Sequence, residues 1–189
     1  MSTEPLAFRD AKEWEAWLAA HAAGRAEVWL KIAKKGSGQV SVTAAEADEV
    51  AICHGWIDSH RKGLDETHFL QRFSPRRKGS PWSRINVDRA EALIAAGRMR
   101  AAGLAEIEAA RTDGRLEAAY ASQRTATVPP DLVEALARDD AARASFESLN
   151  RTDRYAVILR LLKARGPAAR ETQLRRVVDE LRAETQERD

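Results

Sequence analysis

Apolar residues at the start of the chain first follow a helical period and then a strand period. Trp14, Leu18 and His21 share one face of a helix, and Asp10 precedes it as a capping residue. Residues 27–32 then alternate between polar and apolar side chains, which is typical of a half-buried strand. We therefore expect a short helix followed by a strand that faces the core.

A second helix and a hairpin follow in the pattern. The capping sequence that begins at Thr43 predicts a helix over 44–54. Residues 56–61 and 68–73 have strand character, and a turn-forming segment separates them. These two segments are expected to pair as an antiparallel hairpin.

From residue 83 onward the hydrophobic pattern is helical. Residues 115–130 lack clear periodicity and end in a Pro-Pro pair, so they indicate a boundary. The pattern predicts an α+β fold with a small, mainly antiparallel sheet and helices, followed by a helical C-terminal module. The predicted division is a domain over 1–114, a linker over 115–130 and the helical module over 131–189.

Composition narrows the class of protein. The 189 residues carry a net charge of only +2 although 32% of them are charged, so cations matter by their placement. The single cysteine, Cys53, excludes an intrachain disulfide and fits a reducing compartment. No apolar run has the length of a signal peptide or a membrane span. A soluble, cytoplasmic protein without a membrane span is expected.

The segment 72–86, called the basic stretch below, concentrates chemistry that an ordinary scaffold does not require. Arginine guanidinium groups bind phosphate or carboxylate through paired hydrogen bonds, and a tryptophan ring stacks on planar groups. A helix that begins near Ser83 would add free N–H groups. The ligand-binding candidates in this stretch are Arg72, Arg76, Arg77, Ser80, Trp82, Ser83 and Asn86.

A structural interpretation of the same stretch stays open. Its arginines would then pair with nearby carboxylates, and Trp82 would belong to the core. The carboxylates available for such pairs are Asp58, Asp65, Glu66 and Asp88.

Four further residues complete the candidate site. Lys34 and Lys35 follow the first strand at a Gly/Ser turn, and both would join the basic stretch if that strand neighbours the hairpin. Trp56 and Asp58 lie in the first strand of the hairpin. Asp58 would orient an arginine of the basic stretch, whereas Trp56 has the alternative of a core position.

Potential metal ligands are close in sequence but lack a metal-binding spacing. Cys53, His54, Asp58, His60 and His68 fall within 16 positions, without a CxxC or HxxxH pair. We therefore expect neither a metal nor another cofactor.

Several segments together resemble the YdeI/OmpD-associated family, also called bacteriocin-protection proteins. They include SVTAAEADEVAICHGWID, LQRFSPRRKGSPWSRIN and AGRMRAAGLAEIEAA, followed by ATVPPDLVEAL and LNRTDRYAVILRLLKARGPAARETQLRRVVDEL. The resemblance implies the helical C-terminal module of that family and a link to antimicrobial-peptide resistance and a porin. The chain departs from the family at His54, where an aromatic residue is usual.

The leading functional hypothesis is a stress or resistance protein that holds an anionic ligand in the basic stretch. The ligand would be a phosphate-bearing small molecule or a short nucleic-acid segment. One alternative is an enzyme for a phosphorylated or carboxylated small molecule, with Asp58 or His60 as acid/base, although no catalytic signature is present. Another is an interaction module for an acidic protein partner.

Overall fold

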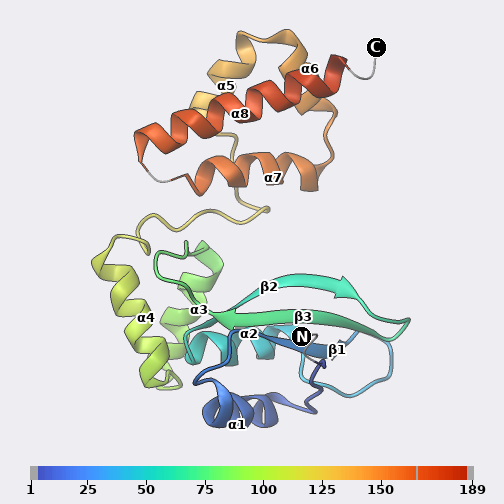
Figure 1. Ribbon diagram of the computed structural model, residues 1–189, viewed down its shortest axis with the longest axis vertical. Helices are drawn as coiled ribbons and strands as arrows, with labels where there is room; N and C mark the ends of the chain where they lie inside the picture. Colours follow the sequence, from blue (N-terminus) through green and yellow to red (C-terminus); the bar gives the residue numbers. More distant parts are fainter. Residues whose placement is uncertain (1–3, 165, 187–189) are drawn as a thin grey trace. The chain divides into compact units, whose positions relative to one another are not determined.

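The structure, a computed structural model, describes residues 4–164 and 166–186, which divide into two compact units. The sheet unit contains the chain up to Trp82 and Asn86–Ala118, and the helical unit contains Ser83–Ile85 and the chain from Ala119. Figure 1 shows the sheet and its helices in the first unit and a group of helices in the second. The predicted α+β class is confirmed.

The sheet has three antiparallel strands, β1 (Val28–Ala33), β2 (Trp56–Gly63) and β3 (His68–Pro75), in the order β1-β3-β2. The strands β2 and β3 form the predicted hairpin, whose register shifts between Asp58 and Arg61. Strand β3 is central, and the segments before His68 and after Pro75 lie at opposite ends of the sheet.

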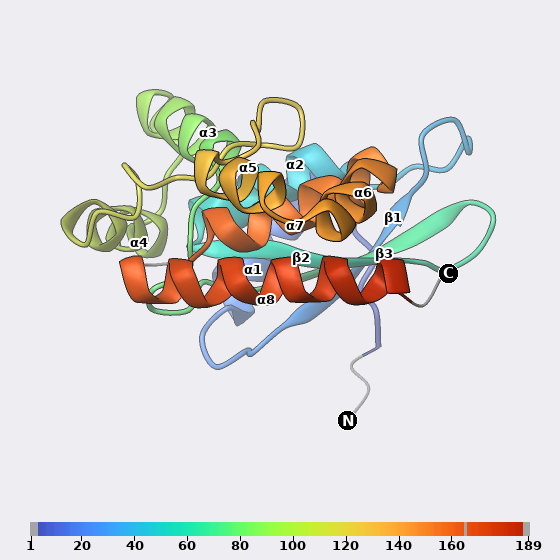
Figure 2. The same ribbon diagram turned by 90° about the horizontal axis from the view of Figure 1, so that it is seen from above.

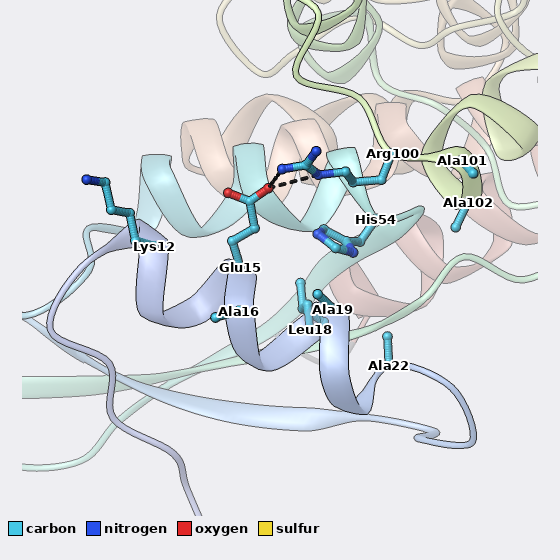
Figure 3. Close-up of a pocket in the computed structure, with 10 residues that line it drawn as sticks. All are labelled: Lys12, Glu15, Ala16, Leu18, Ala19, Ala22, His54, Arg100, Ala101 and Ala102. Carbon is cyan, nitrogen blue, oxygen red and sulfur yellow. Dashed lines mark hydrogen bonds and ion pairs between the residues drawn. The ribbon is translucent and has the colours of Figure 1, made fainter.

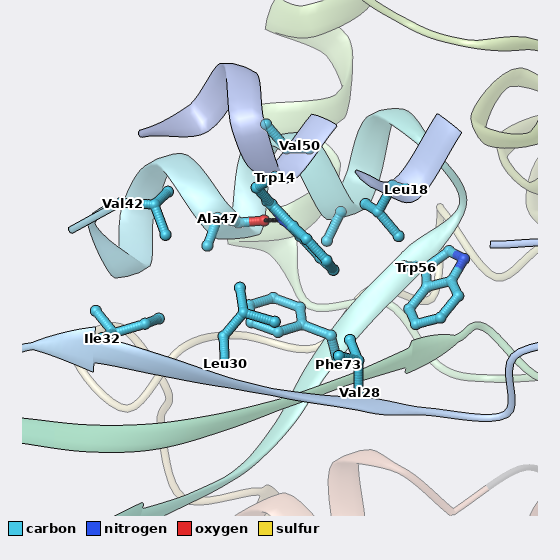
Figure 4. Packing of buried hydrophobic residues seen from close by; sticks show 11 residues of the cluster. Trp14, Leu18, Val28, Leu30, Ile32, Val42, Ala47, Val50, Trp56 and Phe73 are labelled. Carbon is cyan, nitrogen blue, oxygen red and sulfur yellow. Dashed lines mark hydrogen bonds between the residues drawn. The ribbon is translucent and has the colours of Figure 1, made fainter. Parts of the chain in front are cut away.

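Helices α1 (Ala11–His21) and α2 (Ala44–Cys53) cover one face of this sheet. Their start sites follow from capping, since the Asp10 side chain accepts from two backbone N–H groups and Thr43 forms a complete capping box with Glu46. Figure 4 shows the core between helices and strands, in which the Trp14 indole donates a hydrogen bond to the Ala47 carbonyl at 3.2 Å. The core also contains Trp56, which is 3% exposed.

Two further helices, α3 (Arg84–Ala95) and α4 (Ala101–Thr112), follow the hairpin. Helix α4 approaches the end of α2 at Gly103, where an added Cβ would lie 2.3 Å from the Cys53 carbonyl oxygen. The Arg100 backbone N–H donates to the same oxygen at 3.1 Å. A residue without a side chain is therefore required at position 103 for this close packing.

The helical unit consists mainly of α5 (Pro130–Ala137), α6 (Asp140–Ser148), α7 (Arg151–Leu162) and α8 (Pro167–Gln186). Figure 2 shows the long helix α8 running beside the shorter helices, which it contacts. Ala126 and Val128, from the predicted linker, pack against the apolar core of this unit. None of the helices within the described residues has the length and hydropathy for crossing a bilayer.

Candidate functional site

Arg76 and Trp82 of the basic stretch are buried against each other. The guanidinium carbon of Arg76 lies 3.6 Å from the centroid of the Trp82 ring, and Nη1 reaches the Pro81 carbonyl at 3.4 Å. The Arg76 backbone N–H donates to the Gly55 carbonyl, which ties the stretch to the start of β2. Arg76 is 8% exposed and Trp82 2%. Trp82 is therefore buried as in the structural interpretation, and Arg76 is buried by stacking on its ring.

Arg72 lies away from Asp58. Its guanidinium donates to Glu27 at 2.9 and 2.5 Å and to the Ser59 hydroxyl at 3.2 Å. Asp58 pairs with Phe73, and neighbouring strand residues point to opposite faces of a sheet. Of the two arginines that Asp58 was expected to orient, Arg72 is therefore excluded, and its partner is not one of the carboxylates expected from sequence. Burial raises the pKa of Asp58, and the charge of the other arginine, Arg76, opposes this rise.

Of the remaining candidates of the basic stretch, only Arg77 is exposed, whereas Ser80, Ser83 and Asn86 are half-buried. Arg77 and Lys78 are exposed, and the Ser80 carbonyl accepts a hydrogen bond from Arg115 at 3.1 Å. Ser83 pairs with Tyr120 in the helical unit, and the half-buried Asn86 belongs to the first turn of α3.

Arg115 was missed by sequence reasoning because it falls where periodicity is weak. It is 3% exposed, and its guanidinium also donates to Glu106 and Asp113, at 2.7 Å each. A buried arginine with two carboxylates and a carbonyl is a structural anchor, and here it holds the chain at Ser80.

A partly buried pair of carboxyl groups is formed by Asp48 and Asp58, from α2 and β2. Asp48 Oδ2 accepts from Arg89 at 3.2 Å, whereas its Oδ1 is buried with no hydrogen-bond partner among the described residues. Burial, with a contribution from the Asp58 charge, raises the pKa of Asp48 to about 6. Burial also raises the pKa of Asp58, against the effect of nearby arginines. Sequence reasoning selected Asp58 but had no signal for Asp48, one of many acidic residues on a helix.

Lys34 and Lys35 lie at the other end of the sheet from the basic stretch. Ala33 pairs with His68 at the start of β3, whereas Arg76 follows the last residue of β3. At ~3.3 Å per residue, the length of β3 separates the two places by roughly 20 Å. The expectation that the lysines join the basic stretch is therefore wrong.

Both lysines instead line a different cavity, called the cationic pocket below, of about 640 Å³. Arg61 of β2 lines it as well, with Nε donating to Gln71 and its guanidinium carbon 4.5 Å from the Phe69 ring centroid. The pocket is lined by Ala33, Lys34, Lys35, Gly36, Gly38, Gln39, Ser41, Thr43, Ala44, Arg61 and Phe69. These described lining residues include three cations and no carboxylate.

Backbone and side-chain bonds shape the wall of the cationic pocket. The Lys34 ammonium donates to the Asp65 carbonyl at 2.8 Å, and the Ser41 hydroxyl accepts from the Ala33 N–H at 2.9 Å. Gly36 and Gly38 have φ values of 83° and 71°, a region that favours glycine. The loop after β1 is thus held at both ends while its glycines turn the chain around the cavity.

A second cavity, of about 600 Å³, lies between α1, the end of α2 and the start of α4. Figure 3 shows the Glu15–Arg100 ion pair at its edge, His54 beside it and alanines along its wall. Burial lowers the pKa of His54, and its Nε2 is buried without a partner among the described residues.

Cys53 is a buried free thiol whose pKa is raised by burial, so it lacks the environment of a nucleophile. Within the described residues, no three His, Cys, Asp or Glu side chains are grouped so that they could hold a metal ion.

Two protein-family models match the chain. The model described as "Domain of unknown function (DUF8412)" matches residues 6–106, and "Bacteriocin-protection, YdeI or OmpD-Associated" matches residues 125–184. No curated protein and no solved structure gives a significant match. The resemblance seen in the sequence is thus confirmed for the C-terminal segment, whereas residues 42–99 fall within the other match. Because that match spans more than half of the chain, the protein belongs to the DUF8412 family and carries a C-terminal segment similar to the Bacteriocin-protection, YdeI or OmpD-Associated family.

Proposed function

We propose that the protein binds an anionic, phosphate-bearing ligand in the cationic pocket. The observation that supports this most directly is the gathering of Lys34, Lys35 and Arg61 around one cavity whose described lining has no carboxylate. Like charges repel one another, so such a group of cations is most stable when an anion lies between them.

The pocket also offers neutral donors. Ala44 begins α2, and the first N–H groups of an α-helix have no partner within the helix. The nearby Glu46 carboxylate accepts from the Thr43 N–H and hydroxyl, at 2.9 and 2.8 Å, so its position is set by the capping box. Lys34 uses one of its three N–H groups on the Asp65 carbonyl, which leaves two for a ligand.

The cationic pocket lies at the opposite end of the sheet from the basic stretch, where the sequence predicted ligand binding. The exposed cations of the basic stretch are Arg77, Lys78 and Arg84, and Arg77 and Lys78 are adjacent, so one double variant removes both. The name of the family matched over 125–184, Bacteriocin-protection, YdeI or OmpD-Associated, supports bacteriocin protection as the process in which such a ligand is bound.

Isothermal titration calorimetry with inorganic pyrophosphate, ADP and a short oligonucleotide tests the proposal. A charge-assisted hydrogen bond contributes about 1.5–3 kcal/mol, so Lys35→Ala and Arg61→Ala are each expected to weaken binding roughly tenfold or more. The double variant Arg77→Ala/Lys78→Ala distinguishes the two places on the chain. Arg138→Ala, at an exposed cation of the helical unit, is the control.

A wild-type protein that binds none of the three probes would contradict the proposal. A loss of affinity that appears only in the Arg77→Ala/Lys78→Ala variant would show that the ligand binds at the basic stretch. An affinity that grows with oligonucleotide length and falls steeply with salt would identify a nucleic acid as the ligand.

An enzyme is a second candidate, favoured by the Asp48–Asp58 pair. A carboxyl group with a pKa of about 6 can donate and accept protons near neutral pH, which general acid–base catalysis needs. Of the two acid/base candidates, Asp58 belongs to that pair, whereas His60 is exposed on β2. Turnover of a phosphate ester or carboxylate that Asp48→Asn abolishes, with the fold retained, would support it.

A further inference from the structure

Two exposed apolar side chains lie on the loops beside the cationic pocket. Val40, in the loop between β1 and α2, is 78% exposed, and Leu64, in the turn between β2 and β3, is 46% exposed. Single exposed apolar side chains are common on protein surfaces, so these two matter through their position beside the cations of the pocket.

The two loops are joined to each other. The Lys34 backbone N–H donates to the Thr67 carbonyl at 2.8 Å, and the Lys34 ammonium donates to the Asp65 carbonyl at 2.8 Å. Figures 1 and 2 both show the β1–α2 loop and the β2–β3 turn at the same end of the sheet. Cationic and apolar groups are thus presented together at one end of the sheet unit.

Charge at this end is positive on balance. Lys34, Lys35 and Arg61 line the pocket, and the next residue of β2, Lys62, lies over the Trp29 ring. These four cations compare with three carboxylates, Asp65 and Glu66 in the turn and Glu46 in the capping box at Thr43. The Asp65 carboxylate is engaged within the turn, where it accepts from the Thr67 N–H and hydroxyl and from the His68 N–H at 2.7–2.9 Å.

We infer that this end of the sheet unit docks on an anionic lipid surface, an inference that rests on the proposed function. A lipid phosphate would enter the cationic pocket, and Val40 and Leu64 would contact the acyl boundary on either side. Apolar contact combined with attraction to anionic headgroups is how proteins bind a membrane surface without spanning it. A soluble phosphate compound accounts for the cations but leaves Val40 and Leu64 in water.

Sedimentation with lipid vesicles tests the inference on the full chain. We expect binding to anionic vesicles of phosphatidylcholine with roughly 30–40% phosphatidylglycerol. We expect no binding to vesicles of phosphatidylcholine alone. Lys35→Ala is expected to weaken vesicle binding roughly fivefold. Val40→Ser and Leu64→Ser are each expected to weaken it severalfold, because each removes buried apolar surface from the complex.

Leu104→Ser is the matched control, since Leu104 on α4 has the same 46% exposure as Leu64. Because all these side chains are exposed, the substitutions are expected to leave the fold intact. Thermal unfolding of each variant verifies this. Calorimetry with inorganic pyrophosphate is run on the same variants. Val40→Ser and Leu64→Ser are expected to leave pyrophosphate binding unchanged while they weaken vesicle binding.

Binding of pyrophosphate without binding of anionic vesicles would overturn the inference and leave the proposed function standing. Vesicle binding that Val40→Ser and Leu64→Ser reduce no more than Leu104→Ser does would overturn it as well, because the apolar contacts would then have no role. A protein that binds neither pyrophosphate nor anionic vesicles would contradict anion binding in the cationic pocket.

Discussion

Arg76 lies flat against Trp82, with its guanidinium carbon 3.6 Å from the ring centroid and both side chains buried. A desolvated cation–π contact contributes about 2 kcal/mol or more. Arg76→Ala is therefore expected to lower the free energy of unfolding by roughly 2 kcal/mol. Arg77→Ala, at the exposed neighbour, is expected to change it by less than about 0.5 kcal/mol. Urea unfolding of the two variants measures the difference, and equal effects would show that the stacking has no energetic role.

Arg115 joins the end of α4 to the basic stretch through Ser80, Glu106 and Asp113. Removing one partner of a buried ion pair typically costs about 3–5 kcal/mol, because the other charge stays behind. Since Glu106 and Asp113 are partly solvated, we expect Arg115→Met to cost roughly 2–3 kcal/mol of folding free energy.

The control for Arg115 is Arg111→Ala, which removes an exposed ion pair with Glu108. A surface pair of this kind contributes about 0–1 kcal/mol. An Arg115→Met variant as stable as Arg111→Ala would show that the anchor is dispensable.

Asp48 makes stability depend on pH. Its pKa is raised from 3.8 to about 6 in the folded protein, so between these values the folded state binds more protons than the unfolded state. The resulting stabilisation is complete below about pH 4, is lost as pH rises to 6, and is absent above that pH. The shift corresponds to about 3 kcal/mol at most.

Chemical denaturation from pH 4 to 7 measures this dependence. Asp48→Asn is expected to flatten the curve in this range, whereas Asp88→Asn, at an exposed carboxylate of α3, is expected to leave its shape unchanged. A wild-type curve that rises steadily from pH 4 to 7 would contradict the assignment.

Gly103 sets the distance between α4 and the end of α2. Gly103→Ala would place a methyl group 2.3 Å from the Cys53 carbonyl oxygen, so the backbone has to move. Overpacking of this kind costs roughly 1–3 kcal/mol. Gly63→Ala is the control, because an added Cβ there meets no atom within 4 Å. Thermal unfolding compares the two, and equal melting temperatures would contradict the close packing.

Local patterns in the sequence were enough for the class of fold and for its main elements. Asp10 and Thr43 mark helix starts because capping involves only residues within one turn. The hairpin was predictable because its strands are separated by a short turn, and register then follows from the alternation of faces. These interactions are short in sequence, so a single chain displays them directly.

The candidate sites depended on tertiary structure. The period of hydrophobic residues indicates which face of a helix or strand is buried, but it does not indicate which segment packs against that face. Lys34 and Arg61 share a cavity because β1 and β2 both pair with β3, and Asp48 lies near Asp58 because α2 packs on the sheet. Arg76, which composition alone would place in solvent, is buried because Trp82 covers it. The sequence determined which residues carry charge, and the packing of distant segments decided which charges meet, because burial and electrostatic interaction depend on distance in space.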